Sequence, residues 1–304
     1  MNRKYLTLIL LFIILITIYF FPVPSIPFGQ LYAKVDAKQT ASLQNFRQTY
    51  PPKQIEVKGV KWEYVSLGAG KETILFLHGM TGAHDIWWQP MSALQDRYRI
   101  ISVTYPAVDR LEDLSDGVLK ILDTEKVDKV NIVGSSLGGY FTQYLVATQP
   151  QRIQRAVFAN TFPPNEIIAE KNRTIGMLLP YLPEWLVMNV LDGSFRDSVY
   201  PASGKSELTL AFLMEQSHGK MSKAQVLGRY RCVVQPFAAA DAAKLNIPIL
   251  IIESDNDPLV ELVLRERLKA TYPNAKVHTL HNVGHFPYLN MPEAYTKMLE
   301  DFLK

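Results

Sequence analysis

The sequence predicts an α/β domain in which a mostly parallel central sheet is flanked by helices and carries an inserted helical cap. Three observations lead to this prediction. Strand-length and helix-length segments alternate along much of the chain, the strand segments ILFL, VNIV and ILII are apolar at every position, and one long segment interrupts the alternation with helical patterns only. Strands that are apolar on both faces are typical of parallel sheets covered by helices on both sides.

The alternation assigns the core elements in chain order. We expect strands at residues 54–66 (with a turn), 73–77, 99–104, 129–133, 155–159, 248–252 and 275–280, and helices at 114–122, 137–148, 260–272 and 292–303. The helical segment at residues 162–246 is too long to be a loop inside a compact domain. The sequence therefore predicts a core made of residues 54–161 and 247–304, with residues 162–246 as the helical cap.

Composition excludes several classes of protein. Of the 304 residues, 48% are hydrophobic and 20% are charged, which is the balance of a folded globular chain. The net charge of +3, with no basic stripe, argues against nucleic-acid binding. Cys232 is the only cysteine, so the sequence excludes an internal disulfide and a metal site built from cysteines. We expect Cys232 to fill space in the core.

The N-terminal segment departs from this average. Arg3 and Lys4 precede an apolar run at residues 5–21, which Pro22 ends. Such a run, about 17 residues long, covers roughly 26 Å as a helix, the short limit for a bilayer core of about 30 Å. We therefore expect residues 1–24 to form an uncleaved signal anchor, with a cytoplasmic N-terminus and the domain outside, and residues 25–53 to form a spacer. The alternative is secretion after cleavage of a signal peptide.

The segment GSSLGG, residues 134–139, follows an apolar strand and begins an apolar helix. Gly134 and Gly138 lie two residues before and after Ser136, which leaves room for the sharp strand-to-helix turn of a nucleophile elbow. By this spacing Ser136 is the exposed nucleophile and Ser135 is a packing neighbour. The alternative is a tight turn of small residues without chemistry.

A serine hydroxyl needs a base and a group that orients the base. His285, in NVGHFP, follows the last predicted strand, on the side where the carboxyl ends of parallel strands meet. The segment DND after the strand PILIIES offers Asp255 and Asp257, and we favour Asp257 as the orienting acid because Asp255 can act in the turn itself. We therefore expect Ser136, Asp257 and His285 to form a catalytic triad.

An oxyanion hole completes such a site. The strand LFL is followed by His78 and Gly79, where the backbone can turn its N–H groups toward the serine. We assign this role to the backbone N–H groups of Met80 and Leu137, and we expect His78 to hold the loop by hydrogen bonding.

The substrate pocket is the least determined part. His84, in the loop after the first apolar strand, is a candidate pocket residue, and exposure to solvent is the alternative for it. The apolar helices of the cap suggest a pocket for an acyl group through Met177, Leu178, Leu179, Trp185, Leu186 and Met188. Plain packing of these side chains against the core is the alternative. His278 and His281 lie within or at the end of the last predicted strand, where we expect burial to make them structural, and His218 belongs to the cap.

Taken together, these residues resemble the α/β-hydrolase superfamily over residues 54–304. The chain order Ser136, Asp257, His285 is the order of that superfamily. The resemblance implies an α/β-hydrolase fold and hydrolysis of an ester, thioester or amide through an acyl-serine intermediate, as in carboxylesterases and lipases, with a small apolar acyl substrate and with no cofactor or metal. A serine at the elbow argues against epoxide hydrolases and haloalkane dehalogenases, whereas perhydrolase and lyase chemistry stay open.

A closer resemblance carries a different implication. The stretch TYPAVDRLEDLSDGVLKILDTEKVDKVNIVGSSLGGY, followed by RAVFANTF, is similar to the maspardin branch. TYPAVDRLED stands where most superfamily members carry Asp-x-Arg-Gly-x-Gly-x-Ser, so analogies with typical esterase substrates do not transfer. The maspardin resemblance implies a binding or scaffolding protein without clear catalysis, which is the alternative to the hydrolase.

Overall fold

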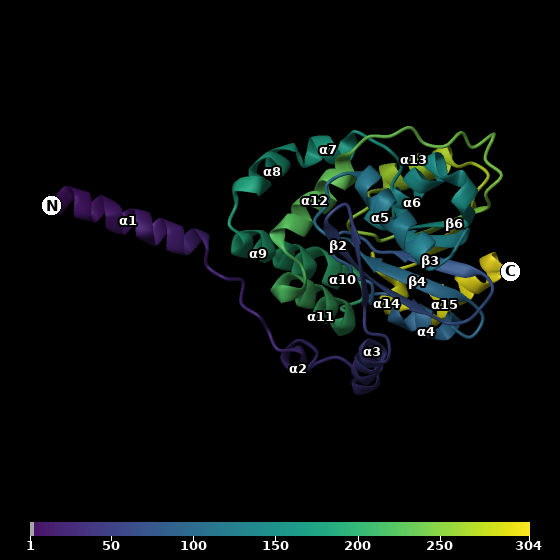
Figure 1. The fold of residues 1–304 in the computed structure, drawn as a ribbon, viewed down its shortest axis with the longest axis horizontal. Coiled ribbons are helices and arrows are strands. Elements are labelled where there is room, and N and C mark those ends of the chain that lie inside the picture. Colours follow the sequence, from purple (N-terminus) through teal and green to yellow (C-terminus); the bar gives the residue numbers. More distant parts are fainter. Residues whose placement is uncertain (1–2) are drawn as a thin grey trace.

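The computed structural model describes residues 3–304 and contains a sheet of eight strands (Figure 1). Their bounds are β1 Lys53–Val57, β2 Val60–Leu67, β3 Thr73–Leu77, β4 Arg99–Thr104, β5 Val130–Ser135, β6 Ile153–Ala159, β7 Ile249–Ser254 and β8 Lys276–Leu280. The spatial order is β1-β2-β4-β3-β5-β6-β7-β8. β2 pairs antiparallel with β1 and with β4, and all the other pairs are parallel. The predicted mostly parallel sheet is therefore confirmed.

Helices cover both faces of the sheet. The helices around the core are α4 Trp88–Leu94, α5 Leu111–Thr124, α6 Leu137–Thr148, α13 Leu262–Thr271, α14 Pro287–Asn290 and α15 Pro292–Leu303. Figure 1 shows α5, α6 and α13 on one side of the sheet and α4 and α15 on the other. The strand β3 explains the arrangement, because Leu75 and Leu77 belong to one buried cluster and Ile74 and Phe76 to the other. Alternation along a strand that is buried at every position thus builds two cores.

The segment between β6 and β7 is mainly helical. Its helices are α7 Ile167–Lys171, α8 Arg173–Leu178, α9 Glu184–Ser194, α10 Tyr200–Ala202, α11 Glu207–Glu215 and α12 Lys223–Val234, and wider π-helical turns lie at Phe195–Val199 and Gln216–Lys220. Leu179, Val187, Met188, Met221 and Val226 form a small apolar cluster of their own. Cys232, on α12, is fully buried in the core, as a core filler would be.

The residues that precede the sheet form two docked helices rather than an extended connection. These are α2, Phe28–Leu31, and α3, Ala37–Thr49, which Asp36 caps by accepting hydrogen bonds from two backbone amides. Tyr32, Leu43 and Phe46 are buried and belong to the apolar cluster on the α4 and α15 side of the sheet. The segment that we expected to be a spacer is therefore packed against the domain.

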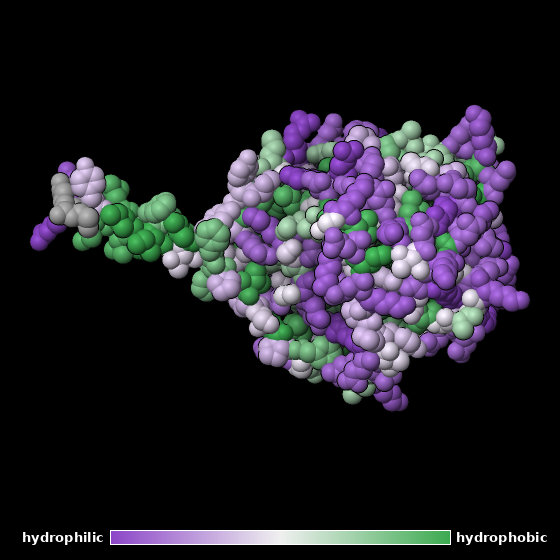
Figure 2. All heavy atoms as spheres, in the orientation of Figure 1, coloured by the Kyte–Doolittle hydropathy of each residue, from purple (hydrophilic) through white to green (hydrophobic). Residues whose placement is uncertain are grey.

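The prediction of a membrane anchor is wrong. The helix α1, Arg3–Tyr19, has 17 residues, and no helix within residues 3–304 is both long and apolar enough to cross a membrane. The physical reason is length, because the helix ends at Tyr19 and leaves Phe20 and Phe21 of the apolar run outside it. Figure 2 shows α1 as an exposed apolar helix that projects from the domain. Met1 and Asn2, which begin the predicted anchor, lie outside the described residues.

Candidate active site

Ser136 lies in a sharp turn between β5 and α6. Its backbone has φ 55° and ψ −121°, a conformation that is uncommon for a residue with a side chain. A Cβ on Gly134 would lie 2.1 Å from the Gly138 oxygen, and one on Gly138 would lie 2.0 Å from the Leu77 oxygen. Glycine is therefore required at both positions, and the close approach of α6 to β3 depends on it.

Hydrogen bonds hold this turn on both sides of the serine. The Ser136 amide donates to the Ala159 oxygen at 3.0 Å, and the Thr161 hydroxyl donates to the Ser136 oxygen at 2.7 Å. Ser136 lines a cavity, whereas the neighbouring Ser135 is completely buried in β5. Of the two adjacent serines, Ser136 is the one that a substrate can reach.

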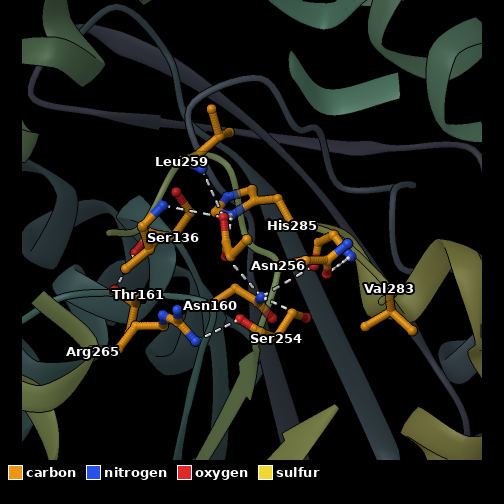
Figure 3. Close-up of polar contacts among 12 residues, drawn as sticks. Ser136, Asn160, Thr161, Ser254, Asn256, Leu259, Arg265, Val283 and His285 are labelled. Carbon is orange, nitrogen blue, oxygen red and sulfur yellow. Dashed lines mark hydrogen bonds and ion pairs between the residues drawn. The ribbon is translucent and has the colours of Figure 1, made fainter. Parts of the chain in front are cut away.

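His285 and Asp257 are in direct contact below this cavity. The Nδ1 atom of His285 lies 2.9 Å from Asp257 Oδ1 and 2.8 Å from Oδ2, and both residues are buried. His285 lines the same cavity as Ser136, and Figure 3 shows the two side chains beside each other. Because the carboxylate accepts a hydrogen bond from the N–H at Nδ1, the proton stays on Nδ1, and the Nε2 atom of His285 keeps its lone pair and can act as a base.

The carboxylate of Asp257 is held in its ionised form. Besides His285 it accepts hydrogen bonds from the amides of Leu259 and Val260, at 2.9 and 3.1 Å, and from the side-chain nitrogen of Asn160 at 2.9 Å. Burial by itself would raise the Asp257 pKa, but the attraction and hydrogen bonding of His285, with the bonds from Asn160 and Leu259, lower the pKa below its ordinary value.

The other candidate acid lies in a separate pair. Asp255 Oδ2 lies 2.7 Å from Nδ1 of His281, and this pair is at the surface. His278, on the edge strand β8, is exposed as well, which differs from the burial expected of it. The structure thus places His285 in contact with Asp257, whereas Asp255 contacts the solvent-exposed His281.

The loop after β3 passes directly beside the serine. A Cβ on Gly79 would lie 3.1 Å from Ser136 Cβ, and both Gly79 and Met80 line the cavity. Leu137 is the first residue of α6, so its N–H has no partner within the helix. The amides of Met80 and Leu137 are therefore on elements that adjoin the hydroxyl of Ser136.

His78 holds this loop from within the protein. Its Nδ1 contacts the Gly79 oxygen at 2.6 Å, and its Nε2 accepts a hydrogen bond from the Tyr105 amide at 3.2 Å. Complete burial, followed by the charge of Arg229, lowers the His78 pKa well below its usual value. His78 is thus a neutral imidazole with its proton on Nδ1, and it carries out the structural role predicted for it.

The cavity above Ser136 has a volume of about 390 Å³ and is mainly apolar. Its apolar lining comes from both the core and the cap: Met80, Phe162, Ile167, Ile168, Leu191, Phe195, Val199, Val233, Pro258, Leu259, Leu264 and Phe286. The charged side chains of the lining are Lys171 of α7 and Glu261 before α13, and they form an ion pair with each other.

The expected pocket residues are not in this lining. His84 instead contacts the Thr104 hydroxyl through Nδ1 at 2.8 Å, and Trp185 donates from Nε1 to the Ile18 oxygen at 2.8 Å. The apolar residues singled out between residues 177 and 188 are also absent from it, because α8 and the first part of α9 lie away from the serine. The cap contributes α7, the end of α9, the π-helical turn Phe195–Val199 and Val233 of α12 instead.

Two residues near the site were not found from the sequence. Asn160 has φ 43°, is buried, and donates to Asp257 from the end of β6. An asparagine directly after a strand was the available signal, since asparagine tolerates positive φ. Arg229 of α12 is 1% exposed and contacts the loop after β3. No pattern in the helix sequence distinguishes it from the exposed Arg231.

Comparison with known proteins identifies the family of this fold. The family model described as alpha/beta hydrolase fold matches residues 72–292. The chain is 27% identical to maspardin of Danio rerio over 256 residues, covering 80% of this chain and 79% of the relative. It is 25% identical to a 2-hydroxy-6-oxononadienedioate/2-hydroxy-6-oxononatrienedioate hydrolase of Paraburkholderia phymatum over 260 residues, covering 79% of this chain and 90% of the relative.

A solved structure shows the same fold. The enol-lactonase from Burkholderia xenovorans LB400 matches with a TM-score of 0.70 and 19% identity, covering 83% of this chain and 99% of that chain. The family match spans most of the chain, and it includes the strand-to-helix turn of Ser136 and the loops of Asp257 and His285. The chain therefore belongs to the α/β hydrolase fold family.

Proposed function

We propose that this chain is a serine hydrolase that cleaves an ester, thioester or amide of an apolar acyl group, with Ser136, His285 and Asp257 as the catalytic triad. One observation supports this most directly, namely the contact of His285 Nδ1 with the buried carboxylate of Asp257 beneath the cavity of Ser136. Burying an ionised carboxylate is costly. A module that only binds has no physical need for it next to a strained serine.

The first half of the reaction forms the acyl-enzyme. Nε2 of His285 takes the proton of the Ser136 hydroxyl while Oγ attacks the substrate carbonyl carbon. The carbonyl oxygen becomes an oxyanion that accepts hydrogen bonds from the amides of Met80 and Leu137. When the tetrahedral intermediate collapses, the bond to the leaving group breaks and His285 gives its proton to that group.

The second half restores the enzyme. Water attacks the acyl carbon as His285 removes one of its protons, and the same two amides stabilise the second oxyanion. Collapse breaks the bond to Ser136 Oγ, which takes the proton from His285 and releases the acid. Throughout, Asp257 stabilises the positive imidazolium and keeps its Nδ1 proton in place.

The lining of the cavity supports an uncharged acyl group as the substrate. The name of the hydrolase from Paraburkholderia phymatum denotes a dicarboxylate. Here the cation of the lining is Lys171, and Glu261 already neutralises it by pairing with it. A second carboxylate on the substrate would meet Glu261 as well as Lys171, whereas an alkyl chain would meet apolar side chains.

The test is labelling with a fluorophosphonate probe, which reacts with an activated serine. We expect the intact protein to be labelled and Ser136→Ala not to be labelled. Ser135→Ala is the matched control, because Ser135 is adjacent but completely buried in β5, and this variant should keep most of the labelling. Equal loss in both variants would contradict the choice of Ser136.

The identity with maspardin favours a second candidate, a non-catalytic binding module with this fold. It predicts that folded protein resists the probe and hydrolyses no p-nitrophenyl ester at any acyl length. Labelling of the intact protein, together with turnover that Ser136→Ala abolishes, would exclude it.

A further inference from the structure

The cap places one buried cation on the loop that carries Met80. Arg229 of α12 donates from Nη1 to the Met80 oxygen at 2.6 Å and to the Gly82 oxygen at 3.2 Å. From Nη2 it donates to the Tyr105 oxygen, after β4, at 2.8 Å. A single planar guanidinium thus joins the cap to the loops that follow β3 and β4.

The charge of Arg229 is not explained by an ion pair. Within residues 3–304, its hydrogen bonds go to backbone oxygens and to the Met221 sulfur, and none goes to a carboxylate. Burial lowers the Arg229 pKa to about 10, so the side chain remains charged at neutral pH. A buried charge is costly, and an apolar side chain of similar length would fill the same space without that cost.

The loop held by Arg229 is the loop of the proposed oxyanion donor. The Met80 N–H belongs to the same planar peptide unit as the Gly79 oxygen, which His78 holds from Nδ1. Arg229 holds the next carbonyl, that of Met80, and the Gly82 carbonyl beyond it. Tyr105 takes part in both sets of contacts, since its amide donates a hydrogen bond to His78 and its backbone oxygen accepts one from Arg229.

We infer that Arg229 is a positioning residue, which aims the Met80 N–H at the reacting carbonyl by holding the loop of residues 79–82 from the cap. The inference rests on the proposed function, because it concerns the oxyanion hole of the same site. It assigns the cap a part in catalysis besides lining the pocket. Without Arg229 the Met80 N–H is no longer held in the direction of the reacting carbonyl. The Ser136 hydroxyl, the His285 imidazole and the apolar lining stay in place.

The experiment compares Arg229→Met and Arg229→Lys with wild-type protein on p-nitrophenyl butyrate. Loss of one oxyanion donor costs roughly 10²- to 10³-fold in kcat. For a donor that is displaced rather than removed, we expect Arg229→Met to lower kcat by about 10- to 100-fold, with KM changed less than about 3-fold. Arg229→Lys keeps the positive charge but not the planar guanidinium with its several N–H donors, and its kcat should lie between those of Arg229→Met and the wild type.

Arg231→Met is the matched control. Arg231 is on the same helix, and its partner Asp109 is at the surface, so kcat should stay at the wild-type value. Circular dichroism and thermal unfolding establish that each variant is folded, and if Arg229→Met does not fold, Arg229→Lys decides.

The outcomes separate this inference from the proposed function. Wild-type protein that resists the fluorophosphonate probe and hydrolyses no ester would overturn both. An active wild type with unchanged kcat in the folded Arg229 variants, or with a change in KM alone, would overturn the role of Arg229 and leave the triad standing.

Discussion

Arg47 of α3 makes a two-pronged ion pair with Glu215 of α11, with Nη1 at 3.0 Å from Oε1 and Nη2 at 2.7 Å from Oε2. The same guanidinium contacts Asp85, in the loop after β3, through Nε at 2.7 Å. Burial by itself would lower the Arg47 pKa, but Asp85 and Glu215 raise it above its ordinary value. One side chain thus connects the N-terminal helices, the core and the cap.

Replacing Arg47 should strongly destabilise the protein. Arg47→Met leaves two buried carboxylates, Asp85 and Glu215, without their cation, and breaking a buried pair from one side costs about 3–5 kcal/mol. Urea unfolding measures the loss. Arg110→Met is the control, since Arg110 pairs with Glu112 at the surface, where a pair contributes about 0–1 kcal/mol. Equal losses of unfolding free energy in the two variants would contradict the role of Arg47 in connecting the N-terminal helices to the core and the cap.

Asp257→Asn should abolish most turnover while leaving the site in place. Asparagine can offer its N–H₂ group to His285 and so favour the wrong tautomer, and such a change costs about 10⁴-fold in kcat in a triad. The control is Asp255→Asn, which removes a carboxylate two residues away that pairs with exposed His281. Steady-state kinetics on p-nitrophenyl butyrate should show little change for this variant. The reverse pattern would make Asp255 the acid.

Gly138→Ala should destabilise the elbow. Its Cβ would lie 2.0 Å from the Leu77 backbone oxygen, and backbone atoms cannot move aside as a side chain can. We expect a loss of at least about 2 kcal/mol in the free energy of unfolding, together with a loss of labelling at Ser136. Gly193→Ala, in α9, has no atom within 4 Å of the added carbon and should be neutral or slightly stabilising.

Glu261→Gln should change the charge preference of the site. It frees Lys171 at the cavity, so an ester whose acyl chain ends in a carboxylate should gain about 5-fold in kcat/KM relative to one of equal length that ends in a methyl group. The gain should shrink in high salt. Glu166→Gln frees Arg267 outside the cavity lining and should leave the ratio unchanged. An unchanged ratio in Glu261→Gln would contradict the proposal that Glu261 neutralises Lys171 in the cavity lining.

Acid should destabilise the protein through Glu125. Burial by itself would raise the Glu125 pKa, but hydrogen bonds from Lys53, Tyr64 and Ser66 lower it from 4.5 to about 2. Because the pKa in the folded state lies below the ordinary value, this stabilisation is complete above about pH 4.5 and is lost as the pH falls toward 2. Unfolding free energies measured across this range should therefore fall less steeply for Glu125→Gln than for the wild type. If the unfolding free energies of the wild type and Glu125→Gln fall equally steeply with pH, Glu125 is not the source of the acid sensitivity.

The regular elements of the core could be predicted from the sequence because their signals are local. The strands 73–77 and 99–104 and the helices 137–148 and 292–303 have the predicted bounds, since each has a clear period and a clear end. Helix α4 was not expected, because Trp88–Leu94 is short and is stabilised by packing against α15 rather than by its own pattern. The docked helices α2 and α3 were missed as well, because α2 has four residues and α3, although it has 13, buries only Leu43 and Phe46 and so has no strong pattern of its own.

The sequence by itself determined the alternation of the core and the elbow of Ser136, because a 3.6-residue or 2-residue period and a pair of glycines act on neighbouring residues. Only the tertiary structure decided that His285 contacts Asp257 while Asp255 goes to His281, and that Arg229 rather than Arg231 is buried on the loop of Met80. These choices depend on which loops meet in space. Turn chemistry favoured Asp257 over Asp255 without deciding between them, and two arginines separated by one residue are equivalent until packing turns one of them inward.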